Sequence, residues 1–176
     1  MKTNQYLIVV DVQKDFVDGV LGTKEAVAII PSVVDKIKKF TGEVIFTQDT
    51  HDFDYLSTIE GKKLPVLHCV KNTTGWLFAK EIIPLTRGRM VFEKPTFGSE
   101  RLVSYLKERH RNDPIQSIEV IGICTDICVI SNVMMIKAAL PNVSLSVSAH
   151  CCAGVTPASH ERALQAMEVV HVDIIK

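Results

Sequence analysis

Short apolar runs alternate with longer segments of helical spacing along most of the chain. Tyr6 to Val10 (YLIVV) is a continuous, largely β-branched apolar run, which is typical of a strand buried on both faces. From Ala26 to Phe40 the apolar positions fall on one helical stripe, which predicts a helix. Similar patterns predict strands over Val44–Thr47, Met90–Phe92, Ser117–Ile123, Val143–Val147 and Val172–Ile175, and helices over Ser99–Arg109, Thr125–Leu140 and Thr156–Val169.

Two segments differ from this pattern. In Val143–Val147 the apolar residues alternate with serines, which predicts a less buried strand at the edge of the sheet. The segment from Thr50 to Pro84 has no sustained periodicity. A loop of that length inside a compact domain is usually functional or disordered.

Repeated strand–helix units predict an α/β protein with a three-layer, Rossmann-like fold, in which helices cover both faces of a mostly parallel sheet. Right-handed crossovers then place the carboxyl ends of the strands along one edge. The length of 176 residues and the hydrophobic content of 47% fit a single domain over residues 1–176.

Composition narrows the classes of partner. The formal net charge is +0 and the basic residues form no dense run, so we expect a small-molecule partner and neither nucleic acid nor a membrane. We also expect a cytoplasmic protein, because the chain has no secretory signal and no apolar run long enough to span a bilayer. Five scattered cysteines, with Cys151 and Cys152 adjacent, suit reduced thiols better than disulfides.

Polar residues follow four of the predicted strands, and they are Asp11, Asp49, Lys94 and Cys128. Ligands of open α/β sheets bind beyond the carboxyl ends of the strands. Singly, each residue has a structural interpretation as a cap, a surface lysine or an inert packed thiol. Their joint placement favours an active site at this edge.

The residue types suggest the roles. Cys128 lies in the apparent first turn of a helix, where free N–H groups and the helix dipole favour a thiolate and can hold an oxyanion. Asp11 can act as its base and Lys94 can supply a positive field. Backbone N–H groups between Ile123 and Cys128 are the natural donors for a tetrahedral oxyanion.

The long loop offers a second cluster. Asp49 and His51 stand two residues apart at a strand end, and His68 follows beyond Glu60. One carboxylate and two imidazoles could converge on a divalent metal, with Glu60 or water as a fourth ligand. Spacing alone favours ordinary loop histidines over this metal site.

Five blocks of the sequence resemble the isochorismatase-like cysteine hydrolases, and within them the bacterial nicotinamidases (pyrazinamidases). The blocks are DVQKDF (11–16), QDTH (48–51), HCVKNTTG (68–75), EKPTF (93–97) and GICTDICV (122–129).

The resemblance implies specific roles for residues in these blocks. It implies a catalytic triad of Asp11, Lys94 and Cys128. It also implies a cis peptide before Cys124, which would turn the Cys124 N–H toward the oxyanion beside that of Cys128, and a ring pocket lined by Phe16 and Cys124.

The same resemblance implies a metal held by Asp49, His51 and His68, with Glu60 added in some members. Zinc is the expected metal, with iron or manganese as alternatives. A six-stranded parallel sheet and homo-oligomers are implied as well.

Some positions depart from the family pattern. Asn72 stands where HCVxGTxG has glycine, Pro65 lies near a site that often carries an aromatic residue, and the usual SAF triplet after Lys94 is absent. Trp76 could replace a missing ring-stacking group or serve the core.

Three hypotheses follow. The first is a metal-dependent nicotinamidase that converts nicotinamide and water to nicotinate and ammonia through a thioester on the cysteine. The second is a metal-independent hydrolase of another small amide or carbamoyl compound. The third is a non-enzymatic protein that uses its thiols for redox chemistry or metal storage.

Overall fold

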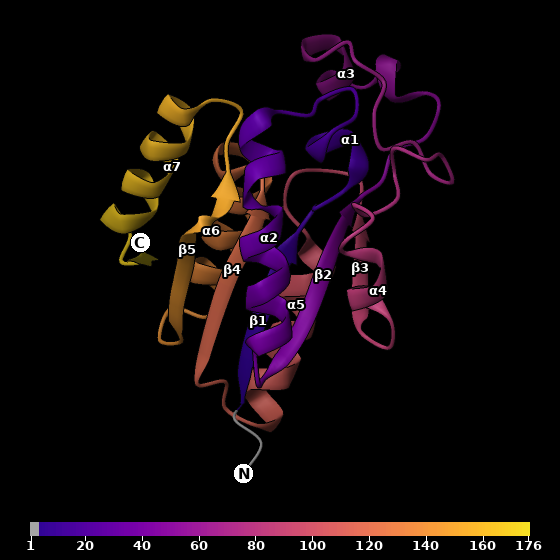
Figure 1. The fold of residues 1–176 in the computed structure, drawn as a ribbon. Helices are drawn as coiled ribbons and strands as arrows, with labels where there is room; N and C mark the ends of the chain where they lie inside the picture. The colour runs from indigo at the N-terminus through magenta and orange to yellow at the C-terminus, as the bar shows by residue number, and fades with distance from the viewer. Residues whose placement is uncertain (1–3) are drawn as a thin grey trace.

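Six parallel strands form one sheet in the computed structural model, which describes residues 4–176 (Figure 1). The strand order is β3-β2-β1-β4-β5-β6. The strands are β1 (Gln5–Val10), β2 (Glu43–Asp49), β3 (Met90–Lys94), β4 (Ser117–Ile123), β5 (Ser144–Ala153) and β6 (Asp173–Ile175). This arrangement confirms the α/β fold and the six-stranded parallel sheet.

Helices cover both faces of the sheet. In Figure 1, α2 lies in front of the sheet, where it contacts β5 and β4, while α5 and α6 pack together behind it. The helices are α1 (Lys14–Val17), α2 (Lys24–Lys39), α3 (Ile59–Lys63), α4 (Ile83–Thr86), α5 (Glu100–Asn112), α6 (Ile130–Ala139) and α7 (Pro157–Val169), with a 3₁₀ turn η1 (Tyr55–Ser57) and a π-helical turn η2 (Thr125–Val129). Among the described residues, none of these helices is both long and apolar enough to cross a membrane.

Local sequence explains where the main elements begin. Leu7 to Val10 of β1 are completely buried, as the continuous apolar run predicts. Helices α2, α5 and α7 each begin after a residue whose hydroxyl oxygen accepts a backbone N–H of the first turn, and these residues are Thr23, Ser99 and Thr156. Such N-caps satisfy donors that have no partner within the helix.

Strand β5 differs from the prediction. It continues through Cys151 and Cys152 to Ala153, and it lies inside the sheet because β6 pairs with its outer side. The register with β4 shifts between Val120 and Gly122, so the second half of β5 does not follow the alternation of the first. Cys151, Cys152 and Ala153 are buried without forming an apolar run, which explains why the sequence pattern predicted too early an end for this strand.

The order of connections changes direction between β1 and β4, which are neighbours in the sheet although β2 and β3 come between them in the chain. Ligands of such sheets bind at this kind of switch point. Gly122 of β4 has a φ of 126°, and a Cβ there would lie only 2.1 Å from the Val10 carbonyl oxygen. Glycine is therefore required where the two strands approach each other.

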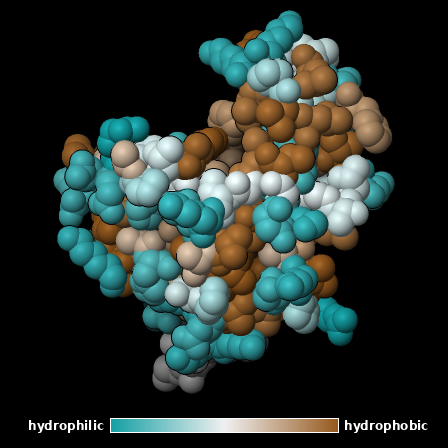
Figure 2. Space-filling model, turned by 45° about the horizontal axis from the view of Figure 1, so that its top comes forward, coloured by the Kyte–Doolittle hydropathy of each residue, from teal (hydrophilic) through white to brown (hydrophobic). Residues whose placement is uncertain are grey.

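The segment that joins β2 to β3 is ordered and lies above the carboxyl ends of the strands (Figure 1). A parallel bridge joins His51 to Val70, and an antiparallel bridge joins Gln13 to Phe78. Figure 2 shows apolar side chains gathered on this part of the surface, where Phe53 and Ile59 are almost four-fifths exposed. The absence of periodicity thus marks an irregular but ordered structure.

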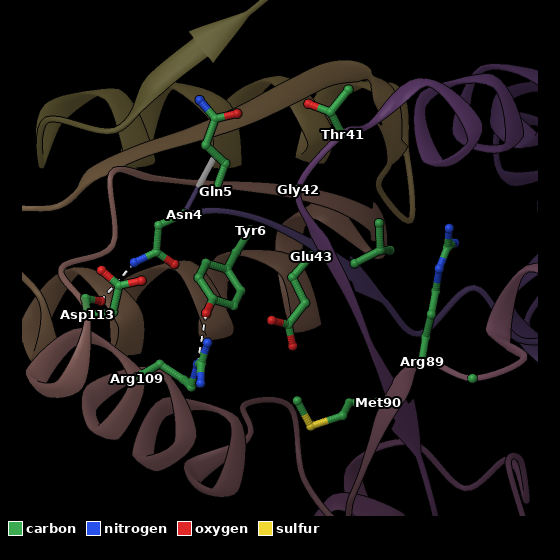
Figure 3. Close-up of a pocket in the computed structure, with 12 residues that line it drawn as sticks. Asn4, Gln5, Tyr6, Thr41, Gly42, Glu43, Arg89, Met90, Arg109 and Asp113 are labelled. Carbon is green, nitrogen blue, oxygen red and sulfur yellow. Dashed lines mark hydrogen bonds between the residues drawn. The ribbon is translucent and has the colours of Figure 1, made fainter. Parts of the chain in front are cut away.

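A hollow lies at the amino end of β1, β2 and β3, opposite the carboxyl ends of the strands (Figure 3). There the Arg109 Nε donates to the Tyr6 hydroxyl over 3.1 Å, and the Asn4 amide donates to the Asp113 carbonyl over 2.8 Å. None of the residues singled out for catalysis or metal binding lines this hollow. The candidate chemistry is confined to the other edge of the sheet.

The buried thiols of β5 predict how stability changes with pH. Burial raises the pKa of Cys151 to about 11 and that of Cys152 to about 12, whereas an unfolded thiol titrates near 8.5. Above about pH 8.5 the unfolded chain therefore binds fewer protons than the folded one, and the free energy of unfolding falls by up to about 1.4 kcal/mol per pH unit for each thiol. We expect urea unfolding of the reduced protein to show that the contribution of these thiols to the free energy of unfolding is constant below about pH 8.5 and decreases above it.

The variant Cys152→Ala tests this assignment, because it removes one of the titrating groups. Its free energy of unfolding should fall less steeply than that of the wild type between pH 8.5 and 10. Parallel curves for the two proteins would show that this thiol does not contribute.

Candidate active site

Asp11, Lys94 and Cys128 meet at the carboxyl edge of the sheet. The Lys94 Nζ lies 2.6 Å from the Asp11 Oδ2 and 3.5 Å from the Cys128 Sγ. Asp11 follows β1, Lys94 ends β3 and Cys128 lies in η2 after β4, and all three are at most 5% exposed. The structure thus brings together the three residues that the sequence predicted as a triad.

Asp11 is held in an unusual backbone conformation with a φ of 48°. Its N–H donates to the Thr47 carbonyl over 3.3 Å, and the Thr47 hydroxyl donates to the Asp11 Oδ1 over 2.7 Å. The second oxygen, Oδ2, contacts Lys94 but makes no hydrogen bond of normal geometry within residues 4–176. One carboxylate oxygen is therefore anchored, while the other remains able to accept a proton.

Lys94 is a buried ammonium shared by two carboxylates. Besides Asp11, its Nζ donates to the Asp49 Oδ1 over 3.1 Å and to the Thr96 carbonyl over 2.9 Å. Burial acts to lower the pKa of Lys94, but Asp11, Cys128 and Asp49 together raise it well above its usual value. Lys94 is therefore positively charged at neutral pH.

Burial favours the protonated form of the Cys128 thiol over the thiolate. Burial raises its pKa well above the usual value, and the nearby Lys94 ammonium offsets only part of that rise. Of the two routes to a reactive thiol that the sequence suggests, this rise favours proton removal by the adjacent base Asp11 over a thiolate stabilised by the helix start. Burial also raises the pKa of Asp11, against the effect of Lys94, which makes this carboxylate a stronger base.

Asn132 fixes the backbone around Cys128, a role that sequence reasoning missed. The buried Asn132 amide donates to the Cys128 carbonyl over 2.8 Å and to the Phe97 carbonyl over 3.1 Å, and its oxygen accepts the Ser99 N–H over 3.0 Å. A polar residue one turn beyond the cysteine in an apolar helix was the available signal. The peptide between Ile123 and Cys124, at the start of the same turn, is cis, as the family resemblance implies.

Asp49, His51 and His68 converge beside this triad. Their ligand atoms all lie within 4.8 Å of one another. The Asp49 Oδ2 is 2.9 Å from the His51 Nε2 and 3.7 Å from the His68 Nε2. The three residues predicted as metal ligands are therefore placed together, and all are buried.

The donor atoms of this cluster suit a divalent metal ion. The buried His51 Nε2 has no hydrogen-bond partner of normal geometry within residues 4–176, and the His68 Nδ1 lies 2.7 Å from the Val66 carbonyl. Because Nδ1 must carry the proton to donate there, the His68 Nε2 keeps a free lone pair aimed at the cluster. One carboxylate and two imidazoles form a donor set typical of zinc and also acceptable to iron or manganese.

Glu60 of α3 flanks the cluster. Its Oε1 is 3.7 Å from the His51 Nε2 and 4.0 Å from the His68 Nε2. The Tyr55 hydroxyl donates to the same oxygen over 3.5 Å. Glu60 lies close enough to serve as a fourth ligand, directly or through water, although it is outside the tight group of three.

A cavity of about 170 Å³ joins the two clusters. Cys128 and Cys124 line one part, Asp49, Glu60 and His68 another, and the remaining wall is largely apolar. Phe16 belongs to this wall, and its ring centroid lies 5.5 Å from that of His68. The cavity therefore combines a thiol end, a metal end and an apolar wall, in which Phe16 and Cys124 hold the predicted places.

One departure from the family pattern, Asn72, has a structural explanation, and the position of Trp76 can also be described. Asn72 has a φ of 66°, a conformation that asparagine tolerates better than most residues other than glycine. Trp76 is not among the residues that line the cavity, and its indole N–H donates to the Thr50 hydroxyl over 2.9 Å. Leu64 and Phe97 are part of the wall instead.

Solved structures of nicotinamidases and pyrazinamidases resemble this chain over nearly its whole length. The pyrazinamidase of Pyrococcus horikoshii in complex with zinc has a TM-score of 0.82 and 24% identity, with 98% of this chain and 99% of that chain covered. A nicotinamidase/pyrazinamidase of Acinetobacter baumanii has a TM-score of 0.81 and 25% identity, with coverage of 100% and 97%. The yeast nicotinamidase bound to the inhibitor nicotinaldehyde has a TM-score of 0.82 and 17% identity, with coverage of 98% and 99%.

No curated protein sequence matches the chain. The family model for the isochorismatase domain, in contrast, matches residues 5–175. Since this match spans almost every residue and the fold agrees with it, the chain belongs to the isochorismatase family.

Proposed function

We propose that this protein is a cysteine-dependent amidohydrolase that converts nicotinamide and water to nicotinate and ammonia. The observation that carries the proposal is that one cavity is lined both by Cys128 and by two of the candidate metal ligands, Asp49 and His68. A small aromatic amide can present its carboxamide to the thiol while its ring nitrogen faces the metal end. The nicotinamidase and pyrazinamidase structures that resemble the chain support this choice of substrate.

The first half of the reaction forms a thioester. Asp11 accepts the Cys128 proton as Sγ attacks the carboxamide carbon, and the developing oxyanion is held by the backbone N–H groups of Cys124 and Cys128. Asp11 then returns the proton to the departing nitrogen, because ammonia leaves readily only when the nitrogen is protonated. The positive charge of Lys94 stabilises the negative charge, whether it lies on Asp11 or on the Cys128 sulfur.

The second half restores the enzyme. Asp11 removes a proton from water, whose oxygen attacks the thioester carbon, and the same backbone donors hold the second oxyanion. Collapse breaks the carbon–sulfur bond and releases nicotinic acid, which loses its proton to solvent as nicotinate, while the proton on Asp11 returns to Cys128. Within residues 4–176, the Asp11 Oδ1 accepts a hydrogen bond from Thr47 while the buried Oδ2 accepts none of normal geometry, an arrangement that suits this repeated transfer.

Asp49, His51 and His68 would hold the metal ion, with Glu60 or water beside them. When bound, the ion supplies a Lewis acid that orients the ring nitrogen of the substrate. Zinc is the metal we propose, because the donor set suits it and because the Pyrococcus horikoshii pyrazinamidase was solved with zinc.

Ammonia release from nicotinamide by the zinc-supplemented protein is the direct test, with a panel of other small amides and carbamoyl compounds for comparison. The variant Cys128→Ala should lower kcat by about 10⁴-fold or more, because it removes the sulfur that forms the thioester. Cys151→Ala is the matched control, since this buried thiol lies toward Lys36 and Glu119 instead of the cavity, and its activity should equal that of the wild type. Ammonia release that survives Cys128→Ala would exclude this nucleophile.

The variant His51→Ala should lose bound zinc and raise KM for nicotinamide together, because one of three tightly grouped ligands is removed. Metal analysis of the purified protein and steady-state kinetics measure the two effects. His150→Ala, at an exposed position of β5, should change neither. Unchanged zinc content in the His51 variant would contradict the metal site, and full activity after chelation would favour a metal-independent amidohydrolase.

A further inference from the structure

We propose that Gln13 and Asp15 are positioning residues for the metal ligands Asp49 and His68, an inference that rests on the proposed metal-dependent function. Both lie in the short segment after Asp11, and neither side chain lines the cavity. They act through hydrogen bonds to the backbone of the ligand-bearing segments.

The buried amide of Gln13 binds the backbone of Asp49 on both sides. Its Nε2 donates to the Asp49 carbonyl over 2.9 Å, and its Oε1 accepts the Asp49 N–H over 2.7 Å. This pairing copies a peptide group of a neighbouring strand, at the point where β1 has already ended. The end of β2, which carries Asp49, is thereby kept in sheet geometry.

The same amide fastens the long β2–β3 connection. The Gln13 Nε2 also donates to the Trp76 carbonyl over 2.9 Å, and the Gln48 amide donates to that carbonyl over the same distance. The indole of Trp76 in turn donates to Thr50. Gln13 therefore ties the segment beyond His68 to the strand end that carries Asp49.

Asp15 performs the matching task for His68. Its Oδ2 accepts the N–H of Cys69, the residue after His68, over 2.8 Å, and its own N–H donates to the Gly75 carbonyl over 3.0 Å. Cys69 has a φ of 45°, so this backbone turns sharply beside the ligand. A Cβ on Gly75 would lie 2.1 Å from the Asp15 carboxylate, which shows how closely the chain is packed around it.

These bonds matter because the metal ligands lie on irregular backbone. His68 and Cys69 belong to neither a helix nor a strand, and a metal site requires its donors to hold their geometry within a fraction of an ångström. Residues that orient the ligands of a metal site typically change its affinity by about 10–100-fold when replaced. Gln13 and Asp15 meet this description through four hydrogen bonds to the backbone of Asp49, Cys69 and Trp76.

The test is zinc affinity, measured by competition with a chromophoric chelator, for the full-length wild type and four variants. Gln13→Met keeps the volume but removes the three hydrogen bonds, and Asp15→Ala removes the acceptor for Cys69. Both should bind zinc about 10–100-fold more weakly. Asp15→Asn keeps an oxygen acceptor and should restore most of the affinity.

Ser148→Ala is the control, because Ser148 is a buried polar residue on β5, separated from β2 by β1 and β4. It should bind zinc like the wild type. The rate of Cys128 alkylation and the melting temperature of the metal-free protein provide readouts that do not depend on turnover. They show whether the fold and the thiol end of the cavity are intact in each variant.

The outcomes separate the two proposals. Wild-type protein that does not bind zinc would overturn the metal site itself. A wild type that binds zinc, together with Gln13→Met and Asp15→Ala variants of equal affinity, would overturn the positioning roles alone. If Gln13→Met does not fold, the Asp15 pair decides: equal weakening in Asp15→Ala and Asp15→Asn contradicts the proposal, and rescue by asparagine supports it.

Discussion

The Lys94 ammonium, buried between two carboxylates, is the interaction on which the site depends. Its contacts with Asp11 and Asp49 join the thiol end of the cavity to the metal end. Two buried carboxylates without a shared cation would repel each other in a poorly solvated region, and removing one partner of a buried ion pair typically costs about 3–5 kcal/mol. Lys94 thus permits two negatively charged groups with different tasks to lie side by side. Asp49 serves both clusters, with Oδ1 toward Lys94 and Oδ2 toward His51.

The strand order of the sheet alone brings these groups to one edge. The change of direction between β1 and β4 makes Asp11 and the turn with Cys128 neighbours, while β2 and β3 bring Asp49 and Lys94 to the same edge. Asp49 and Lys94 are partners in the register of the two strands. The irregular segment between β2 and β3 then adds His51, Glu60 and His68 from above.

Sequence patterns predicted these features where chemistry and periodicity agree. Apolar runs predict the strands, Asp11 and Lys94 stand at the ends of two of them, and Cys128 lies in the turn after a third, so the triad and the sheet could be predicted without a structure. The length of β5 could not, because Cys151, Cys152 and small residues give no apolar alternation. The direction of the pKa shift of Cys128 could not be predicted either, because it depends on how completely the thiol is buried.

Gln13 and Asp15 show a further limit. Their hydrogen-bond partners are backbone atoms of residues that are distant in the sequence. Because every residue has the same backbone groups, the sequence does not show which residues pair in this way. In the candidate metal site, by contrast, the carboxylate and imidazole side chains are themselves typical metal ligands. Support residues of this kind become visible only when their hydrogen bonds can be traced.

The close approach at Gly122 restricts which residue this position can carry. Its α-carbon faces the Val10 carbonyl at a distance that leaves room for a hydrogen atom and nothing larger. Val10 directly precedes Asp11, and Gly122 stands two residues before Cys124. Any side chain at 122 would push apart the two strand ends that bring the proposed base and nucleophile together, so the proposed reaction constrains a position that carries no functional group. Any redesign of this cavity must therefore keep glycine at position 122, where β1 and β4 pair.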